Sequence, residues 1–111
     1  DLVSNVLTNP VNAVNVASGS DTTVAAAPGA GRRIRVHGWV LCAQGAADVR
    51  FESTAGGDAL TGVMRMSSTS PLVAPYNPDG WFDANDNELL NLEVGTADVD
   101  GVIAYSLVGL A

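Results

Sequence analysis

Acidic residues crowded into one stretch of the chain are the first candidates for chemistry. Residues 74–95 read APYNPDGWFDANDNELLNLEVG and hold Asp79, Asp83, Asp86 and Glu88 among several asparagines. Carboxylates that converge on one point could bind calcium, which takes several oxygen ligands. Two carboxylates facing each other in a cleft could instead perform acid–base catalysis. The same residue types also make turns and keep loops in contact with water.

The spacing of these acids does not follow the calcium-binding loop of the EF-hand. Counted from Asp83, that pattern needs Gly at the sixth position and Glu at the twelfth. Here Glu88 stands sixth and Glu93 stands eleventh. A calcium-binding loop of another kind at residues 83–88 stays open. The turn interpretation explains more, because NPDG is a strong β-turn sequence and ANDN is typical of a second turn.

The remaining reactive residues do not favour an enzyme. Acids in turn sequences should stay hydrated and ionised, whereas acid–base catalysis needs a raised pKa on one carboxyl group. Cys42 and His37 are the only residues of their types, and their odd separation predicts opposite faces of one strand. PGAG at 28–31 lacks the Lys-Ser/Thr of a phosphate-binding loop. We predict no catalytic residues, no cofactor and no metal.

Charge and composition argue against nucleic acid and membrane as partners. Five Arg and no Lys face twelve acids, for a net charge of −7, and the basic cluster is Arg32, Arg33 and Arg35. Nucleic-acid binding needs clustered cations that replace phosphate counterions. No apolar run approaches the roughly 20 residues of a membrane span. Only 15% of the residues are charged, which leaves room for burial against other chains.

Segments of alternating apolar and polar residues recur along the chain, separated by Gly, Pro, Asn and Asp. About eight such segments, at roughly ten-residue spacing, predict an all-β fold, an antiparallel sandwich or barrel. PLVAPY is bounded by prolines and predicts an edge strand. The segments are 12–17, 21–27, 32–43, 47–53, 59–68, 71–76, 88–95 and 99–110.

The segment RRIRVHGWVLCA at 32–43 has the clearest alternation, and its two faces are predicted to differ. QGAA after it predicts a hairpin to the next strand, ADVRFES. One face carries Ile34, Val36, Gly38, Val40 and Cys42. The outward face carries Arg33, Arg35, His37, Trp39 and Leu41. Because Trp and Arg often anchor interfaces, we predict a subunit contact on that outward face. The alternative is that a second sheet or a long loop covers Trp39 within the monomer.

The chain is predicted to form a single domain. Residues 29–111 are expected to be the sandwich core, and residues 1–28 an N-terminal arm with the first, weaker strands. Residues 1–10 within this region have the character of an arm that is able to pack on a neighbouring chain.

Several structural motifs resemble one class of virion proteins. They are the basic strand at 32–43, ADVRFES, LTG, P-x-G-W-F at 78–82, E-x-L-N-L at 88–92 and G-x-x-x-Y at 101–105. Together, over roughly residues 30–108, they resemble the capsid decoration (cement or auxiliary) proteins of tailed bacteriophages. Related domains occur in head fibres and tail appendages. The resemblance implies a jelly-roll-like sandwich.

The same resemblance implies a non-enzymatic structural role on the virion. Such a protein would bind the major capsid protein at the capsid surface as a homo-oligomer, a trimer being natural for a shell with threefold sites. The alternative is a receptor- or glycan-binding module of a fibre. In that case Trp81 would be the aromatic platform, beside Asn77, Asp79 and Asp83.

Overall fold

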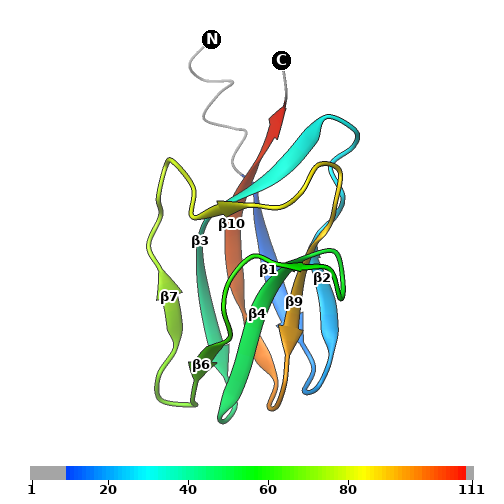
Figure 1. The fold of residues 1–111 in the computed structure, drawn as a ribbon. Coiled ribbons are helices and arrows are strands. Elements are labelled where there is room, and N and C mark those ends of the chain that lie inside the picture. The colour runs from blue at the N-terminus through cyan, green and yellow to red at the C-terminus, as the bar shows by residue number, and fades with distance from the viewer. Residues whose placement is uncertain (1–9, 110–111) are drawn as a thin grey trace.

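The alternating segments build two antiparallel sheets that pack face to face (Figure 1). The structure is a computed structural model that describes residues 10–109. Sheet A has the order β1-β10-β3-β7, with β8 also paired to β3, and sheet B has the order β2-β9-β4-β5, with β6 also paired to β4. The strands are β1 (Val11–Val16), β2 (Asp21–Ala25), β3 (Arg32–Ala43), β4 (Ala47–Ser53), β5 (Asp58–Ala59), β6 (Met64–Met66), β7 (Leu72–Ala74), β8 (Phe82–Asp83), β9 (Leu90–Val94) and β10 (Val99–Gly109).

The order of the strands is that of a jelly roll. Along the chain β1, β2, β3 and β4 alternate between the two sheets, and β9 and β10 return beside β2 and β1. This confirms the predicted all-β sandwich. Ten strands stand where eight segments were predicted. The segment 59–68 gives β6 and part of β5, which both pair with β4, and β8 lies outside the predicted segments and pairs with β3, as β7 does. Residues 10–109 contain no helix that is long and apolar enough to cross a membrane.

The predicted hairpin between β3 and β4 is wrong. β3 pairs with β10 over eleven residue pairs, from Val99↔Ala43 to Gly109↔Arg32, whereas β4 pairs with β9 in the other sheet. Residues 44–46 therefore cross from one sheet to the other, and the Gln44 N–H donates to the Asp98 carbonyl at 3.0 Å. A short Gly-bearing turn permits a hairpin but does not require one, and the long-range pairing with β10 prevails.

A β-bulge in β3 overturns the predicted division of that strand into two faces. Gly38 pairs with Ala104 and Val36 pairs with Tyr105, so His37 is an extra residue without a partner in β10. An extra residue reverses the alternation of the residues beyond it.

The residues after the bulge therefore lie opposite to their predicted faces. Trp39 and Leu41, predicted outward, are core residues with exposed fractions of 8% and 0%. Val40 is 40% exposed, and Cys42 is exposed as well. The alternative interpretation of Trp39, in which other parts of the monomer cover it, is the one observed. Its ring packs on Phe51 of sheet B, with 5.1 Å between the centroids.

The sandwich begins earlier in the sequence than residue 29, where we predicted its core to start. Val14 and Val16 of β1 and Val24 of β2 are buried in the core. β1 and β2 border different sheets, and the Asn12 side chain joins them by donating to the Val24 carbonyl at 2.9 Å. The arm predicted for residues 1–10 lies, apart from Pro10, outside the described residues.

The predicted edge strand is confirmed. β7 has three residues, lies between Pro71 and Pro75, and pairs with β3. Since Pro has no N–H to donate, the prolines limit the strand to this short pairing.

Gly101 provides a test of the β10–β3 pairing on which this fold rests. A Cβ atom at Gly101 would overlap the Val40 carbonyl, which is backbone of the neighbouring strand and cannot rotate away. We expect Gly101→Ala to lower the free energy of unfolding by about 2–3 kcal/mol, measured by urea denaturation. Gly62→Ala is the matched control, because a Cβ there meets nothing within 4 Å. Equal stabilities of the two variants would contradict the close approach of β10 to β3.

Candidate interaction surface

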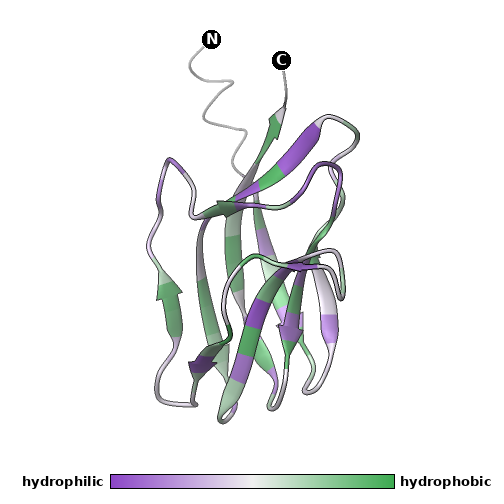
Figure 2. Ribbon diagram, in the orientation of Figure 1, coloured by the Kyte–Doolittle hydropathy of each residue, from purple (hydrophilic) through white to green (hydrophobic). Residues whose placement is uncertain are grey.

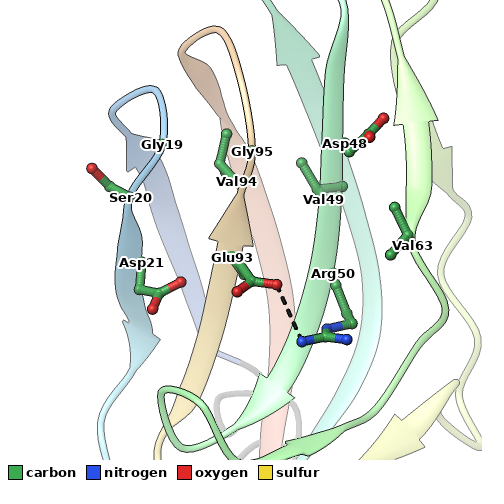
Figure 3. Close-up of a pocket in the computed structure, with 10 residues that line it drawn as sticks. All are labelled: Gly19, Ser20, Asp21, Asp48, Val49, Arg50, Val63, Glu93, Val94 and Gly95. Atoms are coloured by element: carbon green, nitrogen blue, oxygen red, sulfur yellow. Dashed lines mark ion pairs between the residues drawn. The ribbon is translucent and has the colours of Figure 1, made fainter.

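The outer face of sheet B carries a cluster of charged side chains. In register across three strands stand Asp21 of β2, Glu93 of β9 and Arg50 of β4. They line a hollow of about 400 Å³, in which Figure 3 shows the Glu93 carboxylate directed at the Arg50 guanidinium. Carboxylate oxygens of Asp21, Glu52 and Glu93 lie within 4.8 Å of one another. Within residues 10–109 this is the one group of acids close enough together to be considered for a metal ion.

Glu52 is the buried member of this cluster. Its side chain has an exposed fraction of 0% because the loop at 54–57 folds over it. It accepts hydrogen bonds from Arg50 Nε at 3.1 Å, from Asn91 Nδ2 at 3.0 Å and from the Gly56 N–H at 3.2 Å. Burial raises the pKa of Glu52, but the hydrogen bonds from Arg50, Gly56 and Asn91 outweigh it and hold the pKa below its ordinary value of 4.5.

Arg50 supplies one positive charge to this group of three acids. Its guanidinium bonds Glu52 and lies 3.2 Å from Glu93, and the hydrogen bond to Glu52 raises the pKa of Arg50. The cluster is therefore a partly buried ion-pair network that holds the 54–57 loop on sheet B. Alternation in ADVRFES puts Glu52 on the face opposite Val49 and Phe51, which alone would leave it in water. The glycines at 56 and 57, which let the loop fold back over it, are the signal in the sequence for its burial.

The acids of the opening stretch do not come together. Asp83 forms a two-pronged ion pair with Arg35 at 2.8 and 3.1 Å, and Glu88 accepts from Ser53 Oγ at 2.6 Å. Asp86 lies exposed in the second turn. The 83–88 loop thus offers no cluster of carboxylates for calcium, and Asp83 and Glu88 fix the loop to β3 and β4.

The predicted ligand-facing residues belong mainly to a β-turn. The Gly80 N–H donates to the Asn77 carbonyl at 2.9 Å, which closes the NPDG turn as predicted. The Asn77 side chain accepts from the Asp79 N–H at 3.0 Å, and Asp83 is engaged by Arg35. Trp81 remains 47% exposed, while its Nε1–H donates to the Pro75 carbonyl at 3.0 Å. A half-exposed ring is therefore present, although most polar groups around it are already bonded.

The predicted interface residues do not form one patch. Trp39 and Leu41 are in the core, and Arg35 is paired with Asp83. Arg33 is half-buried, and its Nε has no hydrogen-bond partner among the described residues.

His37, another predicted interface residue, is not available to a partner. It is buried, and its ring nitrogens lie 2.8 Å from the Asn77 carbonyl and 2.7 Å from Ser106 Oγ. Its ring also stacks on Tyr76, with 5.2 Å between the centroids. With both nitrogens engaged in this way, His37 cannot serve the exposed Cys42 as a base.

A different surface, the middle of the outer face of sheet A, presents nonpolar side chains, with Asp100 at one end of that face and the Arg35–Asp83 ion pair at the other. The register places Ala13, Val102, Val40 and Val73 in one row across β1, β10, β3 and β7. Directly opposed residues of paired strands share a face. The neighbouring row contains Val11, Ala104 and Gly38. Figure 2 shows β7 as hydrophobic along its length, whereas β4 of sheet B has alternating hydrophobic and hydrophilic bands.

These rows form a shallow apolar groove of about 300 Å³. Its exposed large side chains are Val11 at 62%, Val73 at 57%, Tyr76 at 54% and Val40 at 40%. Large apolar side chains that gather on one exposed face usually mark a contact with another molecule. The alternating pattern missed this surface because the bulge at His37 moves Val40 from the predicted core face to the outer one.

Comparison with known proteins does not assign the chain to a family. No family model and no curated protein matches it. Among solved structures, a chain of the Bacillus endospore appendages, described as a novel family of disulfide-linked pili, is similar with a TM-score of 0.48. It is 13% identical, and the match covers 94% of this chain and 90% of that chain. A likeness this distant does not bear on function.

The Glu52 network gives a prediction on stability. In Glu52→Gln the buried side chain loses the charge that strengthens its hydrogen bonds from Arg50, Gly56 and Asn91. We therefore expect the free energy of unfolding at pH 7 to fall by about 1–3 kcal/mol. Asp48→Asn is the control, because Asp48 is exposed and lies 3.6 Å from an exposed Arg65, and it should change stability by less than about 0.5 kcal/mol.

The same variant should alter the dependence of stability on pH. Because the folded pKa of Glu52 lies below its ordinary 4.5, the unfolded chain takes up this proton first as the pH falls. The Glu52 contribution is therefore complete above the ordinary pKa and is lost as the pH falls through the folded pKa. Urea denaturation from pH 7 to pH 3 should show a shallower loss of stability for Glu52→Gln than for the unmodified chain. Parallel curves would rule out this role of Glu52.

Proposed function

We propose that this chain is a non-enzymatic structural protein of a virion, which binds the capsid surface and associates with other copies of itself. The proposal is carried by one observation, the nonpolar groove in the middle of the outer face of sheet A, whose lining contains no charged residue. The other face of the same sheet already packs in the core through Ile34, Leu41 and Ile103. A sheet with a nonpolar area on each face is suited to burial of both areas.

The two outer faces of the sandwich suggest how the molecule is oriented. Sheet B presents Asp21, Arg50 and Glu93, whose charged groups stay in contact with water when this face is left uncovered. Sheet A presents Val40, Val73 and their neighbours, whose transfer from water contributes roughly 25 cal/mol per Å² of buried area. Sheet A is therefore the side that we assign to protein partners, and sheet B the side that we assign to solvent.

The partners that we propose are other copies of the chain and the major capsid protein. The motifs at 32–43, 78–82 and 88–92 resemble those of phage decoration proteins, which implies a homo-oligomer at threefold sites of the shell. The net charge of −7 would steer the protein towards basic patches of a shell and away from packaged DNA.

The test of this function measures association and shell binding together. Val73→Asp places a carboxylate on the nonpolar face and should weaken both self-association and co-sedimentation with empty capsids by at least about tenfold. Val63→Asp is the matched control, since Val63 is 50% exposed and lines the hollow on sheet B. An unmodified chain that sediments as a monomer at high concentration and leaves empty capsids unbound would refute the proposal.

A second candidate, a receptor- or glycan-binding module, is favoured by the exposure of Trp81. Sugar sites pair an aromatic platform with polar groups, and Trp81 keeps 47% of its surface exposed next to the turn that contains Asp79. Trp39, the other tryptophan, is only 8% exposed.

Fluorescence can test this second candidate directly. Because Trp39 is buried, quenching or a spectral shift caused by added sugars would report on Trp81. A glycan array followed by fluorescence titration should give a response that Trp81→Ala abolishes, with Tyr76→Ala as a control for an exposed aromatic ring nearby. No response across the array removes this candidate and leaves the structural role unaffected.

A further inference from the structure

The nonpolar groove on sheet A lies between two ends of opposite charge. Asp100 of β10 is exposed at one end of the outer face, and Arg33 and Arg35 of β3 stand at the other. Their neighbours Val99 and Ile34 have exposed fractions of 0%, so the three charged side chains point outward. The groove between them has no charged residue in its lining.

The charges of Asp100 and Arg33 are not paired within the part of the chain that the structure describes. Neither residue takes part in an ion pair there. Arg35 is paired with Asp83, so Arg33 has the unpaired positive charge at its end of the face. Its Nε is buried without a hydrogen-bond partner, and a buried polar group in that state is destabilising. Both ends of the face are therefore able to accept an opposite charge from another molecule.

These two charges are placed symmetrically about the groove. Along β10, Asp100 precedes Ala104 by four residues, and Val108, which pairs with Arg33, follows Ala104 by four. Ala104 and its partner Gly38 both line the groove. Consider a twofold axis that is level with this row, parallel to the sheet and at right angles to the strands. It places Asp100 of one copy over the Arg33 end of a second copy, and the symmetry repeats the contact.

We propose that two copies pack through the outer faces of sheet A, with their strands in opposite directions about this twofold axis. The inference rests on the proposed function, which requires copies to associate, and it specifies the face and the orientation. An axis along the strands would instead bring the two Asp100 ends together and the two Arg33 ends together, and like charges repel. The nonpolar groove is covered in both arrangements, so the charges decide between them.

The size of the face determines how strong this contact can be. From Asp100 to Val108 and across β1, β10, β3 and β7, the face measures roughly 27 Å by 19 Å at the usual spacings of residues and strands. This is a flat area of roughly 500 Å² per copy, whereas a standard interface buries about 800 Å² per partner. We therefore expect a reversible dimer with a Kd of about 1–100 μM.

Charge reversal at the two ends tests the orientation. Asp100→Arg and Arg33→Glu should each weaken dimerisation by about tenfold, measured by sedimentation velocity over a concentration series. The double variant exchanges the two charges and keeps the net charge at −7, so it should recover the affinity of the unmodified chain. Asp86→Arg is the matched control, because Asp86 is exposed in a turn and its reversal changes the net charge as Asp100→Arg does. It should dimerise normally.

The outcomes separate this inference from the proposed function. Single reversals that leave dimerisation unchanged, or a folded double variant that stays weak, overturn the twofold contact while the structural role stands. An unmodified chain that is a trimer, or a monomer that still binds empty capsids, has the same consequence. A monomer that leaves empty capsids unbound overturns the structural role as well.

The thiol of Cys42 provides a second measurement that needs no variant, in case Arg33→Glu fails to fold as judged by circular dichroism. Cys42 is exposed and pairs with Asp100 across β3 and β10, so it lies inside the proposed contact. Its alkylation by a maleimide reagent should slow in proportion to the fraction of dimer as the protein concentration rises. An alkylation rate that is the same in monomer and dimer contradicts the proposal.

Discussion

The extra residue that His37 adds to β3 decides which side chains of that strand are available to a partner. Before it, Ile34 and Val36 point into the core, and after it Trp39 and Leu41 do so. The His37 side chain helps to fix the bulge, because both of its ring nitrogens are hydrogen-bonded. The aromatic core and the nonpolar groove both follow from this reversal, since Trp39 fills the first and Val40 lines the second.

The features of the fold that depend on neighbouring residues alone were predicted correctly from the sequence. The strands, the NPDG turn and the edge position of β7 follow from alternation, turn residues and the flanking prolines. The bulge has no such signature, because RRIRVHGWVLCA alternates equally well without it. The sheet to which β4 belongs is set by pairing with β9 in place of β3, a long-range competition that a four-residue turn sequence does not encode.

The candidate surface was predicted in part only, and for the same reason. An interface was predicted from the sequence on β3, which does line the groove. The residues after His37 were assigned to the wrong face of the strand, because the prediction did not include the bulge. Glu52 was missed because its burial comes from the loop at 54–57, which folds over the outer face of its own sheet. On sheet B, Arg50 pairs with Glu52 and Glu93, whereas the middle of the outer face of sheet A exposes nonpolar side chains.

The two borders of sheet A have a further consequence for how copies can be joined. In a fibril that grows by strand addition, every copy pairs with one neighbour at each of the two edge strands of its sheet, so both edges must be open. At the β7 border the pairing ends after three residues between Pro71 and Pro75, whereas β1 is a six-residue border strand. The β7 border therefore disfavours the addition of a further strand, and cross-β growth along sheet A, which needs both borders, is disfavoured with it.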